Sequence, residues 1–207
     1  MHATAQVVHF DTDVVREANS WVRGPNAGME PTLRVLWSHV VPDDFHARYH
    51  ARSRTYRYLL LNEPVAPAVL RDRVGWFHAP LRVEAMQAAC GALLGEHDFS
   101  AFRGSQCQSR SPIRSMFEAR VERHANMLVF TFRANAFLHH MIRNLVGSLV
   151  YIGAGREEPG WLSELLASRD RKRAAPTFAP EGLYLTDVEY DPALGLPRFR
   201  PFMVPPS

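Results

Sequence analysis

Arginine and tyrosine side chains alternate over residues 48–58, and these residue types in this spacing are suited to holding a nucleotide. The set comprises Arg48, Arg52, Arg54, Arg57, Tyr49, Tyr56 and Tyr58. In a β-strand, residues two apart share a face, so the even-numbered members from position 52 to position 58 are expected to point the same way. An aromatic ring stacks on a base of single-stranded RNA, and an arginine fork pairs with its phosphate. The same spacing also fits a solvated strand face with tyrosines packed at its edge.

A second candidate group is His139-His140-x-x-Arg143, in which the arginine follows the histidines by one helical turn. Apolar residues from Leu138 to Ile152 recur at helical spacing, which places His140 and Arg143 on a face away from the apolar stripe. An arginine in this position can orient a carboxylate or a phosphate through two hydrogen bonds. A metal site is not predicted, because no carboxylate or thiolate lies at ligand spacing. The alternative is a helix-end charge that faces solvent.

The third candidate is the segment 99–114, which contains Phe102, Arg103, Arg110 and Arg114. A polar loop is predicted over residues 96–112, and a mobile basic loop is a plausible RNA-gripping element. The alternative is an ordinary surface loop.

Composition and missing motifs exclude several classes of protein. The 207 residues are 46% hydrophobic and 22% charged, which suits one large domain or two small ones and argues against disorder. No apolar run is long enough to span a bilayer and no signal peptide is visible, so we expect a cytoplasmic protein. Cys90 and Cys107 are too few for a disulfide framework, and Cys90 is expected in the core. Phosphate-binding glycine loops, H-E-x-x-H and G-x-S-x-G are absent.

The net charge of +3 rests on 23 arginines and a single lysine, Lys172. Arginine suits phosphate and stacks on bases better than lysine does. Codon bias in a GC-rich genome also explains the ratio, so an argument for nucleic-acid binding must rest on the positions of the arginines.

The helices and strands that must position these residues are read from the sequence pattern. They indicate an α+β protein with a mainly antiparallel sheet and flanking helices. Strands are predicted at 6–11, 33–41, 52–61, 113–123, 127–133 and 183–190. Helices are predicted at 13–23, 83–94, 138–152 and 161–168, with a turn at 24–26 and a helix cap at Gly95. The proline-rich tail from Asp191 is expected to lie over the surface.

Six stretches, in order along the chain, carry a more specific signal. They are His2–Phe10, Pro42–Arg48, Thr55–Tyr58, Cys107–Arg110, Ala134–Asn144 and Glu181–Leu185. Together they closely resemble the tRNA pseudouridine synthase A family from residue 2 to about residue 190, with hardly any shift in spacing.

The resemblance implies an enzyme that converts uridines 38, 39 and 40 of the tRNA anticodon arm to pseudouridine without a cofactor. It also implies a homodimer in which two α+β halves of each subunit share a sheet and a basic cleft. In the family, an aspartate attacks the flipped-out uridine and the glycosidic bond breaks. The base then turns and rejoins the sugar through C5.

Four residues of this sequence match functional positions of the family. Tyr56 matches the active-site tyrosine, which stacks on the target base and is a candidate for proton transfer. Arg143 matches the arginine that pairs with the catalytic aspartate and holds that carboxylate ionised. Arg103 and Arg110 belong to the family's basic loop and are expected to contact tRNA.

One family motif is not found in these 207 residues. The nucleophile lies in Gly-Arg-Thr-Asp-Ala-Gly-Val, which runs directly into the residues that match His2-Ala3, so the resemblance places the aspartate three residues before Met1. We therefore expect a pseudouridine synthase fold that lacks most of its N-terminal half. Residues 1–45 are expected to be a remnant of the N-terminal domain, 46–190 the C-terminal domain and 191–207 a tail.

The 207-residue chain as written is accordingly expected to be inactive. A non-catalytic tRNA-binding remnant is one alternative, and a chain that does not fold is another. An unpaired strand at residues 6–11 would favour aggregation in the latter case.

Overall fold

A single sheet organises the molecule, which we describe over residues 1–198 from a computed structural model. Its seven strands follow the order β1-β7-β2-β6-β5-β4, with β3 added beside β2. They are β1 (His2–Ala3), β2 (Ser53–Asn62), β3 (Gly75–Phe77), β4 (Gly95–Asp98), β5 (Ile113–His124), β6 (Met127–Ala134) and β7 (Leu183–Glu189). The β1–β7 and β2–β3 pairs are parallel, and the other pairs are antiparallel. The predicted α+β class with a mainly antiparallel sheet is confirmed.

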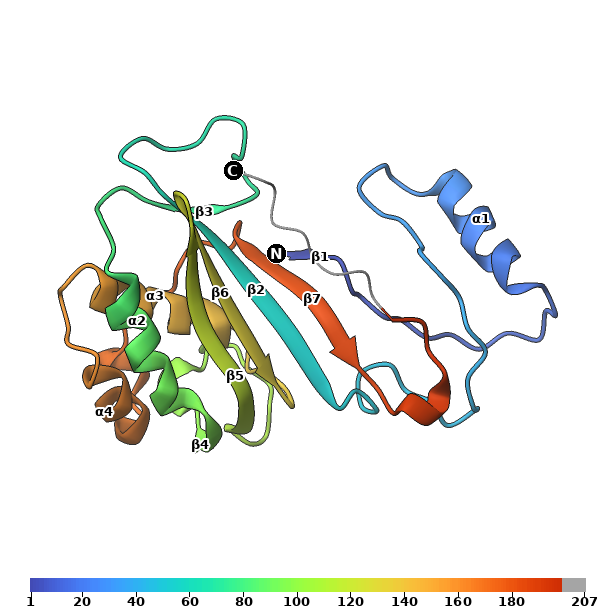
Figure 1. The fold of residues 1–207 in the computed structure, drawn as a ribbon. Coiled ribbons are helices and arrows are strands. Elements are labelled where there is room, and N and C mark those ends of the chain that lie inside the picture. Colours follow the sequence, from blue (N-terminus) through green and yellow to red (C-terminus); the bar gives the residue numbers. More distant parts are fainter. Residues whose placement is uncertain (199–207) are drawn as a thin grey trace.

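Three of the four α-helices gather near the β5–β6 end of the sheet, and the fourth stands apart from it beyond β7 (Figure 1). The gathered helices are α2 (Val83–Cys90), α3 (Met141–Gly153) and α4 (Trp161–Ser168), and the separate one is α1 (Ala18–Gly28). Short 3-10 turns occupy 91–93, 100–102, 171–173 and 192–194. No helix among residues 1–198 has the length and apolarity that a membrane crossing requires.

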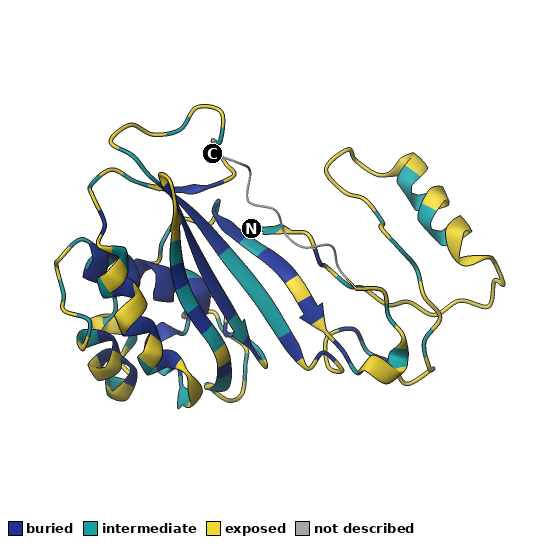
Figure 2. Cartoon of the chain, viewed as in Figure 1, coloured by how far each residue is buried: buried dark blue, intermediate teal, exposed yellow. Residues whose placement is uncertain are grey.

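The main core lies between the sheet and helices α2, α3 and α4. Strand side chains such as Tyr58, Phe130 and Phe132 pack there against Leu145 and Leu149 of α3. Helix α3 is buried almost throughout, as its dark colour shows (Figure 2). Arg143, which was predicted to lie on a face away from the apolar stripe, is not among the buried residues of this helix.

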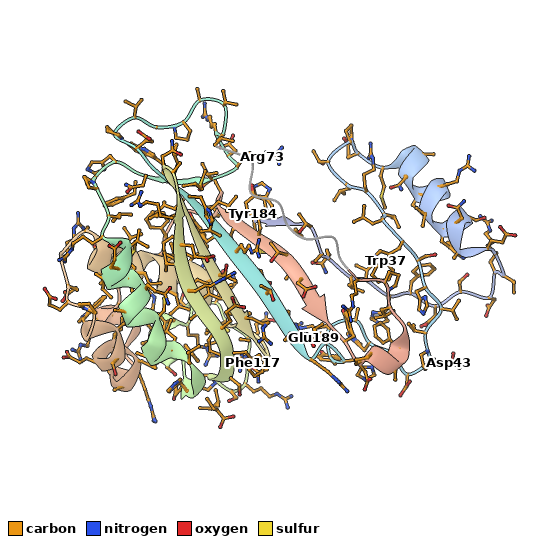
Figure 3. The ribbon with its side chains drawn as sticks, viewed as in Figure 1. Trp37, Asp43, Arg73, Phe117, Tyr184 and Glu189 are labelled. Atoms are coloured by element: carbon orange, nitrogen blue, oxygen red, sulfur yellow. The ribbon has the colours of Figure 1, made fainter. Side chains whose placement is uncertain are left out.

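The opposite face of the sheet is covered at one end by the β2–β3 connection. Leu59 and Leu61 of β2 form a small apolar cluster there, and Leu70 packs against it. The Tyr184 hydroxyl donates a hydrogen bond to the Arg73 carbonyl at 2.6 Å, which ties this connection to β7 (Figure 3).

Predictions for the central and C-terminal elements hold closely. Strand β2, the β5–β6 hairpin with its turn at Ala125, helix α4 and strand β7 all lie within two residues of the predicted bounds. Helix α2 ends in a 3-10 turn, and Gly95 does not cap it but begins β4 with a φ of +96°. The predicted polar loop at 96–112 begins with strand and 3-10 structure and buries Phe99 and Phe102, because these rings belong to the main core. Part of the predicted tail, 199–207, lies outside the described residues.

Predictions for residues 6–44, which we call the N-terminal arm, are mostly wrong. Neither 6–11 nor 33–41 forms a strand, and α1 runs through the predicted turn at Pro25. An alternating strand needs a neighbour, and within residues 1–198 none pairs with these segments. Val8 and Val40 are consequently 75% and 91% exposed, and α1 buries no side chain. Before β2, the polypeptide forms a strand of the sheet only at His2–Ala3, which pairs with Tyr184–Leu185.

Replacing Gly182 with alanine tests the close backbone packing at the start of β7. An added Cβ would lie 2.3 Å from the Leu59 carbonyl oxygen and 2.7 Å from the Gly75 nitrogen, and backbone atoms cannot move aside cheaply. We expect Gly182→Ala to lower the free energy of unfolding by about 2 kcal/mol or more in urea titrations.

Gly28→Ala in α1 is the matched control, because nothing lies within 4 Å of its added Cβ. It should leave the unfolding midpoint unchanged or raise it slightly. Equal midpoints for the two variants would contradict the described packing.

Candidate active site

A cleft of about 1240 Å³ opens beside β2 and the first turn of α3. It brings together Tyr56 and Arg143, which lie far apart in the sequence. Its other charged or aromatic lining residues are His9, His46, Arg48, Arg54, Arg114, Phe137, His139, His140 and Tyr190. Among the residues that the structure describes, the lining contains four arginines and no aspartate or glutamate. An arginine-rich cavity of this kind suits an anionic ligand.

Tyr56 lies on the helix-covered side of β2 and borders the cleft. Its ring contacts Phe137 edge to face, with 5.1 Å between the centroids. Burial raises the pKa of the Tyr56 phenol, and the charge of Arg54 opposes that rise only in part. The phenol therefore keeps its proton at neutral pH and can donate a hydrogen bond.

Arg143 is the third residue of α3, and a backbone carbonyl fixes its direction. Its Nε donates to the Phe178 oxygen at 2.6 Å, and the Phe178 nitrogen donates back to the Arg143 oxygen at 3.2 Å. Within residues 1–198 the guanidinium makes no other hydrogen bond or ion pair. Its remaining N–H groups are available to an anion in the cleft.

The segment 174–179, which we call the strap, holds the Phe178 carbonyl in place. Asn144 is fully buried and accepts hydrogen bonds from Thr177 Oγ1 at 2.7 Å and Arg171 Nη2 at 3.0 Å. The strap approaches α3 closely at Gly147, where an added Cβ would lie 2.4 Å from the Pro176 oxygen. The orientation of the cleft arginine thus depends on polar and steric contacts behind it.

His139 and His140 lie before α3 rather than within it, which corrects the helical placement expected for them. His140 has a φ of 61° and caps the helix, and the two rings stack with 3.8 Å between their centroids. Burial lowers the pKa of His140, and the charges of His139, Arg143 and Arg171 lower it further. Arginine rather than His140 therefore supplies the positive charge in this part of the cleft at neutral pH.

Arg54 joins two walls of the cleft. Its guanidinium donates to the carbonyl oxygens of Ala51 at 2.9 Å and Asn135 at 2.7 Å, and also to that of Arg48. Burial lowers the pKa of Arg54 below the ordinary arginine value. Arg54 was predicted to lie on the same strand face as Tyr56. Its hydrogen bonds also anchor the 48–51 turn to the segment after β6.

Two of the three loop arginines expected to grip RNA, Arg103 and Arg110, do not line this cleft. Arg103 Nη2 donates to the carbonyl oxygens of Cys107 at 2.8 Å and Ser109 at 2.7 Å, so it stabilises its own loop. Arg110 is exposed. Arg114, which had been grouped with them, does line the cleft and donates to Ser109 Oγ at 2.7 Å.

Sequence reasoning missed Gln106, Gln108 and Phe137 as lining residues. Gln106 and Gln108 flank Cys107, and all three residues line the cleft. The carboxylates Glu118, Asp187 and Glu189 line a separate groove of about 740 Å³, which also contains Arg57 (Figure 3 labels Glu189). No three His, Cys, Asp or Glu side chains among residues 1–198 are placed to hold a metal ion.

Comparisons with known proteins identify the family. A family model described as tRNA pseudouridine synthase matches residues 89–191, which include the loop, the hairpin, α3, the strap and β7. The segment 89–191 therefore resembles isomerases of the tRNA pseudouridine synthase class.

Relatives named tRNA pseudouridine synthase A match nearly the whole chain. Those from Dechloromonas aromatica and Methylobacillus flagellatus are 56% and 53% identical over 197 residues, or 95% of this chain and 75% and 76% of theirs. The one from Bordetella petrii is 56% identical over 192 residues, covering 93% of this chain and 72% of its own. The chain belongs to the tRNA pseudouridine synthase A family.

The two cysteines should differ sharply in reactivity. Burial raises the pKa of the Cys90 thiol to about 12. Burial acts in the same direction on Cys107, but hydrogen bonds from the Ser109 and His139 backbones and the charge of Arg103 outweigh it and lower the pKa. Since the thiolate is the reacting form, we expect alkylation of Cys107 by iodoacetamide to rise with pH around a midpoint below that of a cysteine peptide.

Cys107→Ser should abolish this reaction, and Cys90 should stay unmodified until the protein unfolds. A Cys107 midpoint at or above that of the peptide would show that the loop contacts do not stabilise the thiolate.

Proposed function

We propose that this chain provides the RNA-binding cleft of an enzyme that isomerises uridine to pseudouridine at positions 38, 39 and 40 of tRNA. The observation that carries the proposal is the meeting of Tyr56 and Arg143 in one arginine-lined cleft. Both residues match functional positions of the family to which the chain belongs.

Tyr56 stacks on the flipped-out uracil and keeps its phenolic proton. Its ring already forms one wall of an aromatic corner with Phe137, so a planar base can enter against it. The buried phenol is a hydrogen-bond donor at neutral pH and is placed to take part in proton transfer.

Arg143 pairs with the nucleophilic aspartate and keeps it ionised. The strap fixes the guanidinium through Nε, and the other N–H groups are available to a cleft whose lining among residues 1–198 contains no carboxylate. A carboxylate brought to this position would gain two charge-assisted hydrogen bonds, which lower its pKa.

In the family, the aspartate lies in a segment that precedes the position matched by His2. The reaction breaks the bond between C1′ and N1 and forms one between C1′ and C5. The C5 proton leaves to solvent and N1 gains a proton, so no cofactor is consumed. Without the attacking carboxylate, the 207 residues alone bind tRNA but do not turn it over.

Further parts of the proposal rest on the family resemblance. Residues 1–45 complete the N-terminal domain of the enzyme, and residues 46–190 form its C-terminal domain. Arg103 stabilises a loop that contacts tRNA, and the exposed Arg110 contacts the RNA backbone outside the cleft. The active enzyme is a cytoplasmic homodimer.

A tRNA-binding protein without catalysis is the second candidate function. The absence of aspartate and glutamate from the cleft lining among the described residues favours it. Turnover distinguishes the two candidates, because both require the same cleft.

Tritium release from tRNA labelled at uridine C5 tests the catalytic proposal. The 207-residue chain should release none. The same chain preceded by the corresponding segment of the Dechloromonas aromatica relative should release tritium, and Asp→Asn in that segment's Gly-Arg-Thr-Asp motif should abolish release. Release by the 207-residue chain would refute the assignment of the nucleophile, and an inactive chimera that binds tRNA would favour the second candidate.

Substitutions in the cleft test the binding proposal on the 207-residue chain. Tyr56→Ala should weaken tRNA binding by about 1–3 kcal/mol through loss of base stacking, and Tyr56→Phe should retain most of the affinity. Arg143→Ala should weaken binding and make its dependence on salt less steep. Fluorescence anisotropy at several salt concentrations measures both effects.

Arg71→Ala is the matched control, because Arg71 is an exposed cation on the β2–β3 connection and lies outside the cleft lining. Equal losses for Arg71→Ala and Arg143→Ala would indicate non-specific attraction and contradict a role for the cleft.

A further inference from the structure

Two glutamine side chains on the rim of the cleft have no assigned role. Gln106 and Gln108 both line the cleft and are exposed, whereas Tyr56 lies deeper and is half-buried. Within residues 1–198 neither amide makes a hydrogen bond. Each therefore offers an unused donor and an unused acceptor to a ligand in the cleft.

The backbone that carries these amides is fixed on several sides. Arg103 donates to the carbonyl oxygens of Cys107 and Ser109, and the Cys107 nitrogen donates to the Gly104 oxygen at 3.0 Å. The Gly104 nitrogen donates to the His139 oxygen at 2.8 Å, and the His139 nitrogen donates to Cys107 Sγ at 3.4 Å. This loop is docked on the turn before α3, so the backbone positions from which the two glutamine side chains reach the cleft are fixed.

The docking gives structural roles to two neighbours of the glutamines, Gly104 before them and Cys107 between them. A Cβ on Gly104 would lie 2.9 Å from the His139 oxygen, so a larger residue would push the loop away from the turn. The sulfur of Cys107 accepts a hydrogen bond from that turn, and Cys107 lines the cleft together with Gln106 and Gln108.

Amides and guanidinium groups recognise different parts of RNA. Arginine pairs with phosphate, and four arginines already line this cleft. An amide carries no charge but places a donor beside an acceptor, which matches the edge of a base. Its oxygen and nitrogen exchange places by rotation of the terminal torsion, so one glutamine can pair with a donor–acceptor edge in either order.

We propose that Gln106 and Gln108 bind the exposed edge of the nucleotide next to the target uridine, without selecting which base it is. The target occupies the deeper position at Tyr56, and its neighbour in the chain meets the rim. This inference rests on the proposed function. An enzyme that acts at three positions meets different neighbouring bases at each, so contacts that accept any base suit it.

The experiment measures the affinity of the 207-residue chain for an anticodon-arm hairpin whose only uridine among positions 38–40 is at 39. Gln106→Ala and Gln108→Ala together should weaken binding about tenfold or more. Two further hairpins carry an abasic residue, one at position 38 and the other at position 40. In one of them the double variant should bind as tightly as the wild type, so that the ratio of their dissociation constants falls to about one. That hairpin identifies which neighbour is held.

Salt dependence separates a base contact from a phosphate contact. The slope of log affinity against log salt should be unchanged by the double glutamine substitution, whereas Arg48→Ala should reduce it by about one. Gln106→Glu with Gln108→Glu keeps the side-chain size but removes the donors, and it should weaken binding at least as much. Ser105→Ala, an exposed position of the same loop outside the cleft lining, should have no effect.

Several results would overturn the proposal. An unchanged ratio in both abasic hairpins would mean that the glutamines do not contact the neighbouring base, and a reduced salt slope would assign them to phosphate. A tenfold loss for only one identity of the neighbouring base would show sequence selection. Failure of the wild-type chain to bind tRNA would instead refute the proposed function and this inference with it.

Discussion

The close approach of the strap to α3 is the contact on which the cleft depends. A carbonyl of the strap fits against Gly147, where no Cβ intervenes, and the next residues bind Asn144 and Arg143. The strap then runs into β7, whose start is closely packed at Gly182. The strap therefore fixes the direction of the cleft arginine, and Gly182, a few residues further on, fixes the start of the strand that pairs with β1. Because protein interiors are close-packed, displacing the strap at one point would disturb both.

The electrostatics of the cleft follow from which groups are buried there. Arginine stays charged in the folded protein, although burial lowers the pKa of Arg54. Burial and neighbouring charges keep His140 neutral, and burial keeps Tyr56 protonated. The cleft therefore combines permanent positive charge with uncharged donors. This combination attracts RNA phosphates, and it stabilises the ionised form of a carboxylate that enters from another segment.

The N-terminal arm shows what happens to strand-like sequence without neighbouring strands. Its alternating apolar residues would need a partner to form a ladder, and within residues 1–198 they remain largely exposed. Val7 and Val41 of the arm pack against the apolar cluster that Phe45 forms with Leu185, Val188 and Tyr190. The relatives are longer than this chain, which spans about three quarters of their length. The arm differs from the rest of the fold because, among residues 1–198, no strand pairs with it and few of its apolar side chains are covered.

The sequence by itself determined the elements whose apolar pattern matches their final surroundings, such as the β5–β6 hairpin, α4 and β7. It also indicated Tyr56 and Arg143, because their motifs are specific. Tertiary structure alone decided that these two side chains share a cleft, that Arg103 serves its own loop and that the first turn of α3 excludes the histidines. The physical reason is that periodicity reports which face of an element is buried, whereas a side chain's partners depend on segments that the fold brings from elsewhere.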